Sequence, residues 1–179
     1  MRILQVSAEI FPLLKTGGLA DIAGALPAAL QEAGCDVRVM LPGFPAICAG
    51  LDGAVPVGSF AMPWGERVEV VYGTLPALAR EGRTLGAYVL IAPGLYDRPG
   101  NPYEDANKQA YGDNHRRFAA LGLAAAHVAH GLDAQWRPQL VHSHDWHAAL
   151  APASLALWNE GRGPHVPSVY TVHNLAYQG

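Results

Sequence analysis

The sequence predicts an α/β fold built on a parallel sheet, with a β-rich insertion in the first half of the chain. The first forty residues read as strand, loop, helix and strand, and a strand–helix–strand pattern closes the chain. Between them, residues 42–96 show strand patterns without a convincing helix. Half of the 179 residues are apolar and only 15% are charged, which suits a buried parallel sheet. A chain of this length supports one core, so we expect one domain.

The first unit begins with Ile3–Ala8, a short apolar run that we expect to be the central strand. Apolar residues then recur at helical spacing over 19–34, which predicts a helix kinked at Pro27. Asp36–Leu41 is the next predicted strand. A strand, a helix and a second strand in this order favour a right-handed parallel crossover.

The insertion contains three strand-like segments separated by glycine and proline, Val55–Phe60, Val68–Tyr72 and Tyr88–Ile91. Their spacing predicts a partly antiparallel arrangement. Residues 96–103 are rich in proline, glycine and asparagine and therefore read as a loop.

The second half returns to the alternating pattern. A core-facing helix is expected between Asp113, a candidate N-cap, and the terminator Gly131. Leu140–Ser143 is then a strand, a helix follows to about Glu160, and Val166–Val172 is the last strand.

Polar clusters follow three of these strands, at residues 7–15, His144–His147 and His173-Asn174. In open α/β sheets, ligands bind outside the carboxyl ends of the strands. The sequence therefore predicts a ligand site at one edge of the sheet.

The first cluster leads into Lys15-Thr16-Gly17-Gly18-Leu19-Ala20-Asp21, where a loop passes into a helix. Gly17 and Gly18 let a ligand approach the backbone, the helix start offers N–H groups, and Lys15 adds positive charge, which together suit a phosphate. A tight turn beside a solvated lysine explains this heptapeptide about equally well. The order of residues matches neither a P-loop nor a G-x-G-x-x-G loop, so a nicotinamide dehydrogenase is not supported.

The histidines of residues 142–147 raise the question of a metal site. A dinuclear hydrolase pattern would need aspartate at position 146, where this chain has Trp146, so we expect no metal and rank a metal hydrolase last. Asp145 also fits an N-cap of the following helix, a role compatible with contacting a sugar. His173 ends a strand on the same side as Asp145 and Lys15.

Charge and composition narrow the class of partners and the compartment. The net charge is −3 and no basic block is interleaved with aromatic residues, which argues against nucleic acid. The N-terminal apolar run is too short for a signal peptide or a membrane span, and Cys35 and Cys48 suggest neither a disulfide nor a metal pair. We therefore expect a cytoplasmic protein without a membrane partner.

Four separated motifs carry a resemblance to a known family. They are Ser7-Ala8-Glu9 with residues 15–21, the loop 95–103, His144–Ala148 and the segment 171–179. In this order they resemble the bacterial glycogen synthases and plant starch synthases, which transfer glucose from a sugar nucleotide to a growing α-1,4-glucan. The resemblance spans the whole chain.

The resemblance implies a GT-B-type glycosyltransferase with two Rossmann-like lobes, helices on both faces of the sheet and the active site between the lobes. Residues 1–179 look like the N-terminal lobe, and the missing C-terminal lobe holds the nucleoside. The implied donor is ADP-glucose, with UDP-glucose as the alternative, and the acceptor is an α-1,4-glucan. Transfer retains the anomeric configuration and needs no cofactor. The alternative is a stand-alone carbohydrate- or nucleotide-binding module without catalysis.

By the same resemblance, Lys15 and Gly18, with Gly17 beside them, contact the phosphates of the nucleotide sugar. The residues implied to line the sugar and acceptor side are Asp21, Tyr96, Asp145, Trp146, His147, His173 and Asn174. Asp145 and His173 are the catalytic candidates, and the resemblance does not make Asp145 a nucleophile.

Overall fold

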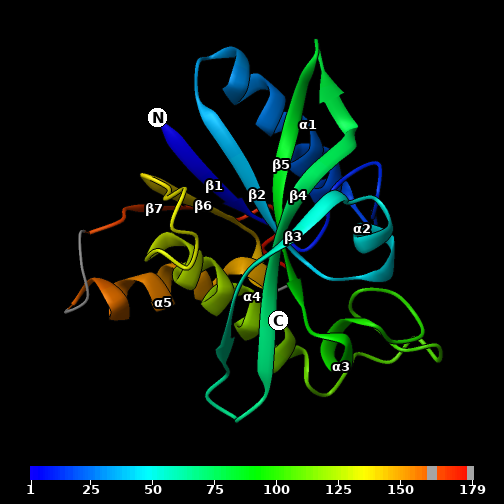
Figure 1. Cartoon of the computed structure of the whole chain (residues 1–179). Helices are drawn as coiled ribbons and strands as arrows, with labels where there is room; N and C mark the ends of the chain where they lie inside the picture. Colours follow the sequence, from blue (N-terminus) through cyan, green and yellow to red (C-terminus); the bar gives the residue numbers. More distant parts are fainter. Residues whose placement is uncertain (161–164, 177–179) are drawn as a thin grey trace.

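The computed structural model describes residues 1–160 and 165–176, and its strands form one mixed seven-stranded sheet (Figure 1). The strand order is β3-β4-β5-β2-β1-β6-β7. The elements are β1 (Arg2–Val6), α1 (Gly18–Glu32), β2 (Asp36–Pro42), α2 (Pro45–Ala49), β3 (Asp52–Ala61), β4 (Arg67–Arg80), β5 (Arg83–Ile91), α3 (Pro93–Tyr96), α4 (Asn114–Ala129), β6 (Leu140–His144), the 3₁₀ turn η1 (Trp146–Ala148), α5 (Leu150–Asn159) and β7 (Ser168–Thr171).

The parallel half of the sheet confirms the predicted alternation. β1 pairs in parallel with β2 on one side and β6 on the other, so it is central as expected. β5 joins β2 and β7 joins β6, both in parallel. The predicted β-rich insertion is confirmed as well, because β3 and β4 extend the sheet as antiparallel strands beyond β5.

Helices cover both faces of the sheet, as the right-handedness of crossovers between parallel strands requires. The step from β1 through α1 to β2 runs in one direction along the strand order, whereas β5 to β6 through α4 and β6 to β7 through α5 run in the other. Right-handed crossovers therefore place α1 on one face and α4 with α5 on the opposite face. Figure 1 shows α4 and α5 lying together, apart from α1. No helix in the described ranges is long and apolar enough to cross a membrane.

The contact between α4 and α5 depends on small residues. A Cβ added at Gly122 would lie 2.8 Å from the backbone of Leu150 and Ala151, so only glycine permits this approach. Alanines such as Ala120 and Ala124 are fully buried on the same helix. The core of the domain therefore continues from the sheet into the α4–α5 contact.

One expectation about local structure was wrong, and another holds only for the position of the residue. The stretch 42–96 contains the short helices α2 and α3, each begun by a proline that presets the first helical φ. Asp113 does occupy the N-cap position of α4, but its side chain makes no capping bond. Its carboxylate instead accepts two hydrogen bonds from Arg98, at 2.8 and 2.7 Å.

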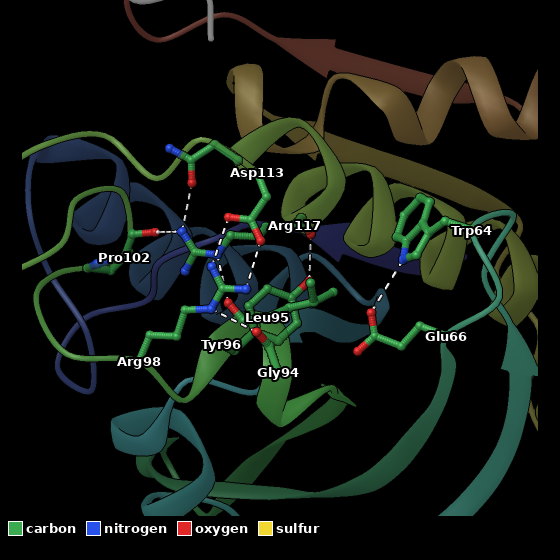
Figure 2. Close-up of polar contacts among 10 residues, drawn as sticks. Trp64, Glu66, Gly94, Leu95, Tyr96, Arg98, Pro102, Asp113 and Arg117 are labelled. Atoms are coloured by element: carbon green, nitrogen blue, oxygen red, sulfur yellow. Dashed lines mark hydrogen bonds and ion pairs between the residues drawn. The ribbon is translucent and has the colours of Figure 1, made fainter.

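Arg117 ties the loop over residues 97–113 to α4 (Figure 2). The side chain is 1% exposed. Its Nε donates to the carbonyl oxygen of Leu95 at 2.7 Å, and Nη1 donates to the carbonyl oxygen of Pro102 at 2.9 Å and to Oδ1 of Asn114 at 2.7 Å. Tyr96 donates in turn to the carbonyl oxygen of Arg117 at 2.7 Å. This buried guanidinium therefore fixes both ends of a loop that contributes to the site below.

Replacing Arg117 with methionine is expected to lower the free energy of unfolding by about 2–4 kcal/mol, because buried carbonyl oxygens lose their donors. Urea unfolding followed by tryptophan fluorescence measures the change. Arg98→Met is the matched control, because it breaks the ion pair with Asp113. The two side chains of that pair are 28% and 30% exposed, so the free energy of unfolding should fall by only about 1 kcal/mol or less. Equal losses in the two variants would contradict the special role of Arg117.

Candidate functional site

A cavity of about 970 Å³ opens where β1 and β6 end. It lies where the polar clusters after the strands predict a ligand site. Its lining includes the expected residues Gly17, Gly18, Asp145, Trp146, His147, His173 and Asn174, together with Glu9, Thr16, Leu19, Asn101, Tyr103, Glu104, Ala110, Asn114 and Ala176.

Glu9 organises the glycine loop. It follows β1 and is 2% exposed. Oε2 accepts the backbone N–H of Thr16 at 2.6 Å and that of Gly17 at 3.4 Å, while Oε1 accepts the Thr16 hydroxyl and the Tyr103 hydroxyl. The carboxylate thus occupies the loop N–H groups before the helix and leaves those from Gly18 onward for a ligand. No role was predicted for Glu9 from the sequence, although a carboxylate shortly after a buried strand is a usable signal.

The two glycines are not explained by the fold. A Cβ added at Gly17 or Gly18 meets no atom within 4 Å. Gly17 has a φ of −151°, an extended conformation that any residue adopts. Neither packing nor backbone geometry therefore demands glycine here, which favours the ligand-approach interpretation over the tight turn.

Lys15 and Asp21 lie beside the cavity but do not line it. The Lys15 ammonium donates to both carboxylate oxygens of Asp21, at 2.8 and 2.7 Å, and the two side chains are about half exposed. Asp21 therefore pairs with Lys15 and does not lie among the residues that line the cavity, where it was expected.

The expectation that Tyr96 lines the site is corrected. Tyr96 is 1% exposed in the core, its ring packs edge-on against Phe44, and its hydroxyl bonds to Arg117 (Figure 2). Burial raises the pKa of this hydroxyl well above its ordinary value. Tyr103, from the loop that Arg117 holds, reaches the cavity instead.

Tyr103 forms an aromatic wall with the residues after β6. Its ring stacks on His147 with centroids 4.6 Å apart, and His147 lies 4.0 Å from Trp146. Phe118 of α4 supports this wall edge-on against Trp146, at 4.9 Å. Burial, then the Glu9 carboxylate, raises the pKa of Tyr103, so the phenol keeps its proton. The wall offers flat apolar surface of the kind that binding clefts use.

Asp145 lines the cavity and has a strained backbone. Its φ of 60° and ψ of −179° belong to a region that is essentially reserved for glycine. Its N–H donates to the carbonyl oxygen of Thr171 at 2.8 Å. The side chain is 7% exposed, makes no capping bond, and its Oδ1 has no partner among the described residues. Asp145 therefore occupies the N-cap position of η1, as expected, but its side chain does not cap the turn, so the carboxylate is not engaged by the helix.

Three histidines lie together where β6 and β7 end, and one of them, His173, lines the cavity. The rings of His142 and His144 lie 4.1 Å apart, and Nδ1 of His144 lies 3.0 Å from Nε2 of His173. The pKa of His144 is lowered to about 3, chiefly by burial and further by the neighbouring imidazoles. Burial alone lowers the pKa of His147 to about 3. Across residues 1–160 and 165–176, no histidine, cysteine, aspartate and glutamate side chains group in a way that could hold a metal ion.

These pKa values predict that the fold loses stability in mild acid. The unfolded chain protonates His144 and His147 near their ordinary value of 6.5, whereas the folded chain resists protonation down to about 3. The contribution is therefore complete above pH 6.5 and is lost as pH falls toward 3, by about 5 kcal/mol for the two side chains together between pH 7 and 4.5. Urea unfolding across this range measures it. The double variant His144→Gln, His147→Gln should flatten the curve, and an unchanged slope would contradict the assignment.

Comparison with known proteins decides the family. The family model described as "Starch synthase catalytic domain" matches residues 2–179. The chain belongs to the starch synthase catalytic domain family. This confirms the resemblance drawn from the four motifs.

Curated members of the starch synthase catalytic domain family include proteins named glycogen synthase. That of Variovorax paradoxus is 63% identical over 180 residues, covering all of this chain and 36% of the relative. That of Leptothrix cholodnii is 55% identical over 184 residues, with 37% of the relative covered. The chain thus spans just over a third of the length of these relatives.

Among solved structures, a part of the catalytic domain of starch synthase IV from Arabidopsis thaliana, which is bound to ADP and acarbose, has the same fold. The TM-score is 0.69 at 23% sequence identity, and the match covers 98% of this chain and 34% of that one. The predicted GT-B-type α/β fold is therefore confirmed for this member of the starch synthase family.

Proposed function

We propose that residues 1–179 form the N-terminal lobe of a retaining glucosyltransferase that transfers glucose from ADP-glucose to the non-reducing end of an α-1,4-glucan. The relatives named glycogen synthase support this activity. The observation that carries it is the cavity at the strand ends, where a glycine-rich helix start faces the Asp145 carboxylate and the ring of His173. UDP-glucose remains the alternative donor.

On the phosphate side, the start of α1 and Lys15 would stabilise the departing nucleoside diphosphate. Negative charge on that group grows as the glycosidic bond breaks, so preorganised N–H donors and a nearby ammonium act most strongly in the transition state. Gly18 supplies the close approach because its missing side chain leaves open space at the helix start.

On the sugar side, the anomeric carbon becomes positively charged in the transition state. The Asp145 carboxylate, buried and with Oδ1 unpaired among the described residues, would stabilise this charge without serving as a nucleophile. Tyr103 and Trp146 line the cavity and would exclude water from the reacting sugar. His147 and Asn174 would contact sugar hydroxyls.

A chimera tests the proposed activity. Residues 1–179 replace the aligned 180 residues of the Variovorax paradoxus glycogen synthase, and release of ADP is followed with ADP-glucose and glycogen. We expect turnover, with UDP-glucose as the competing donor in a parallel assay. A chimera that folds and binds ADP as the parent enzyme does, yet transfers no glucose to glycogen, would overturn the proposal.

Gly18→Ala is expected to separate stability from donor binding in this chimera. Alanine favours the helix by up to about 1 kcal/mol, whereas its methyl group occupies the space proposed for the phosphates, so KM for ADP-glucose should rise about tenfold. Steady-state kinetics and urea unfolding measure the two effects. Gly112→Ala, which also meets no atom within 4 Å but lies outside the cavity lining, is the control and should leave KM unchanged. An unchanged KM in Gly18→Ala would favour the tight-turn interpretation.

A further inference from the structure

The contact between His144 and His173 fixes how the cavity histidine can bond. His144 ends β6 and is 1% exposed, and His173 lines the cavity. Nδ1 of His144 and Nε2 of His173 are 3.0 Å apart, the distance of a hydrogen bond. In a neutral imidazole one ring nitrogen donates and the other accepts, so one of these two nitrogens carries the shared proton.

His144 is neutral around pH 7 because burial, followed by the charges of His142 and His173, lowers its pKa to about 3. It therefore carries a single N–H, on either Nδ1 or Nε2. The position of that proton decides the tautomer of both rings.

The surroundings of Nε2 of His144 favour the proton on Nδ1. Nε2 is buried and has no partner in the described part of the chain. The neighbouring His142 is engaged elsewhere, because its Nε2 lies 2.8 Å from the Thr171 hydroxyl. A buried N–H without an acceptor is rarer and costs more than a buried lone pair without a donor. The arrangement with Nε2 of His144 unprotonated is therefore the stable one.

We propose that His144 is a positioning residue that donates its Nδ1–H to Nε2 of His173 and thereby fixes His173 as the Nδ1–H tautomer. The only lone pair on the His173 ring is then used by His144. His173 offers the cavity a hydrogen-bond donor, suited to a sugar or phosphate oxygen, and has no nitrogen available to take the proton of an attacking hydroxyl. His173 is thus a donor to the ligand and not a general base.

That the Nδ1–H of His173 donates to a sugar or phosphate oxygen rests on the proposed function. That His173 carries its proton on Nδ1 does not. The tautomer is a property of the free chain and is measured without any turnover. Failure of glucosyl transfer and failure of this inference are therefore distinguishable.

The test is a long-range ¹H–¹⁵N correlation spectrum of the chain labelled at its histidine nitrogens, at neutral pH. Resonances are assigned by their loss in His173→Gln and His144→Gln. We expect the shift of a protonated nitrogen at Nδ1 and of an unprotonated nitrogen at Nε2, in His144 and His173 alike. A protonated Nε2 in His173 of the unaltered chain would overturn the inference.

His144→Phe keeps an aromatic ring but removes the donor. The two His173 shifts should then move toward each other, as expected for a ring that exchanges between tautomers. His142→Gln is the matched control, because the ring of His142 contacts that of His144 in a tilted arrangement while its Nε2 lies within hydrogen-bond distance of Thr171, and the His173 shifts should stay as they are. Unchanged His173 shifts in a folded His144→Phe chain would also overturn the inference.

Discussion

Replacing Asp145 by glycine is expected to stabilise the fold while nearly abolishing glucosyl transfer. The backbone of Asp145 lies at a φ of 60° and a ψ of −179°. Glycine adopts this conformation without strain, whereas other residues are strained by about 1–3 kcal/mol. Relief of that strain exceeds the flexibility that glycine adds to the unfolded chain, about 0.5–1 kcal/mol. Loss of one preorganised charge at a reacting centre lowers kcat by about 10²–10³. A residue that costs stability and supplies activity is the signature of a functional site.

Two further variants separate charge from strain. Asp145→Asn keeps a strained side-chain-bearing residue but removes the charge, so kcat should fall as in Asp145→Gly without the gain in stability. Asp52→Asn changes an exposed carboxylate at the start of the edge strand β3 and should alter neither quantity. Urea unfolding of the chain and steady-state kinetics of the chimera provide the measurements. Near-parental kcat in Asp145→Gly would remove Asp145 from the proposed mechanism.

The sheet was predictable because the spacing of apolar residues indicates which strands and helix faces are buried. β1, α1 and β2 follow directly from the runs at 3–8, 19–34 and 36–41. The short helices α2 and α3 were missed because each has too few residues for a helical period to show. Only the proline at the first position of each helix hinted at them.

The site was partly predictable because strand ends meet at one edge whatever the loops do. The positions of Asp145 and His173 beside the cavity were predicted in this way. The bond from Tyr103 to Glu9 joins residues 94 positions apart, which no local pattern reveals. The sequence places Tyr96 and Tyr103 in one predicted loop, where no periodicity shows which tyrosine faces the cavity. Tyr96 was therefore predicted at the site, although Tyr103 lines the cavity.

The 179-residue chain alone is expected to fold yet to show no measurable glucosyl transfer. Folding is expected because the strands, α1 and α4 enclose a continuous apolar core. No transfer is expected because the chain corresponds to 36% of the length of a relative, and we propose that the donor and acceptor are held between this lobe and the missing one. Positioning two reactants supplies up to about 7–11 kcal/mol of catalysis, which half a cleft cannot provide. Half a cleft also admits water to the reacting sugar.

Release of ADP from ADP-glucose in the presence of glycogen tests this expectation for the chain, for the chain with the missing lobe added in trans, and for the chimera. Calorimetric titration of the chain alone with ADP-glucose and with a maltooligosaccharide measures the weak binding that the cavity should retain. Binding without turnover in the chain, and turnover in the chimera, would show that the second lobe contributes positioning and water exclusion rather than the whole ligand site. Turnover by the chain near that of the chimera would mean that Asp145, His173 and the start of α1 suffice for catalysis, and the proposed division into half-sites would be wrong.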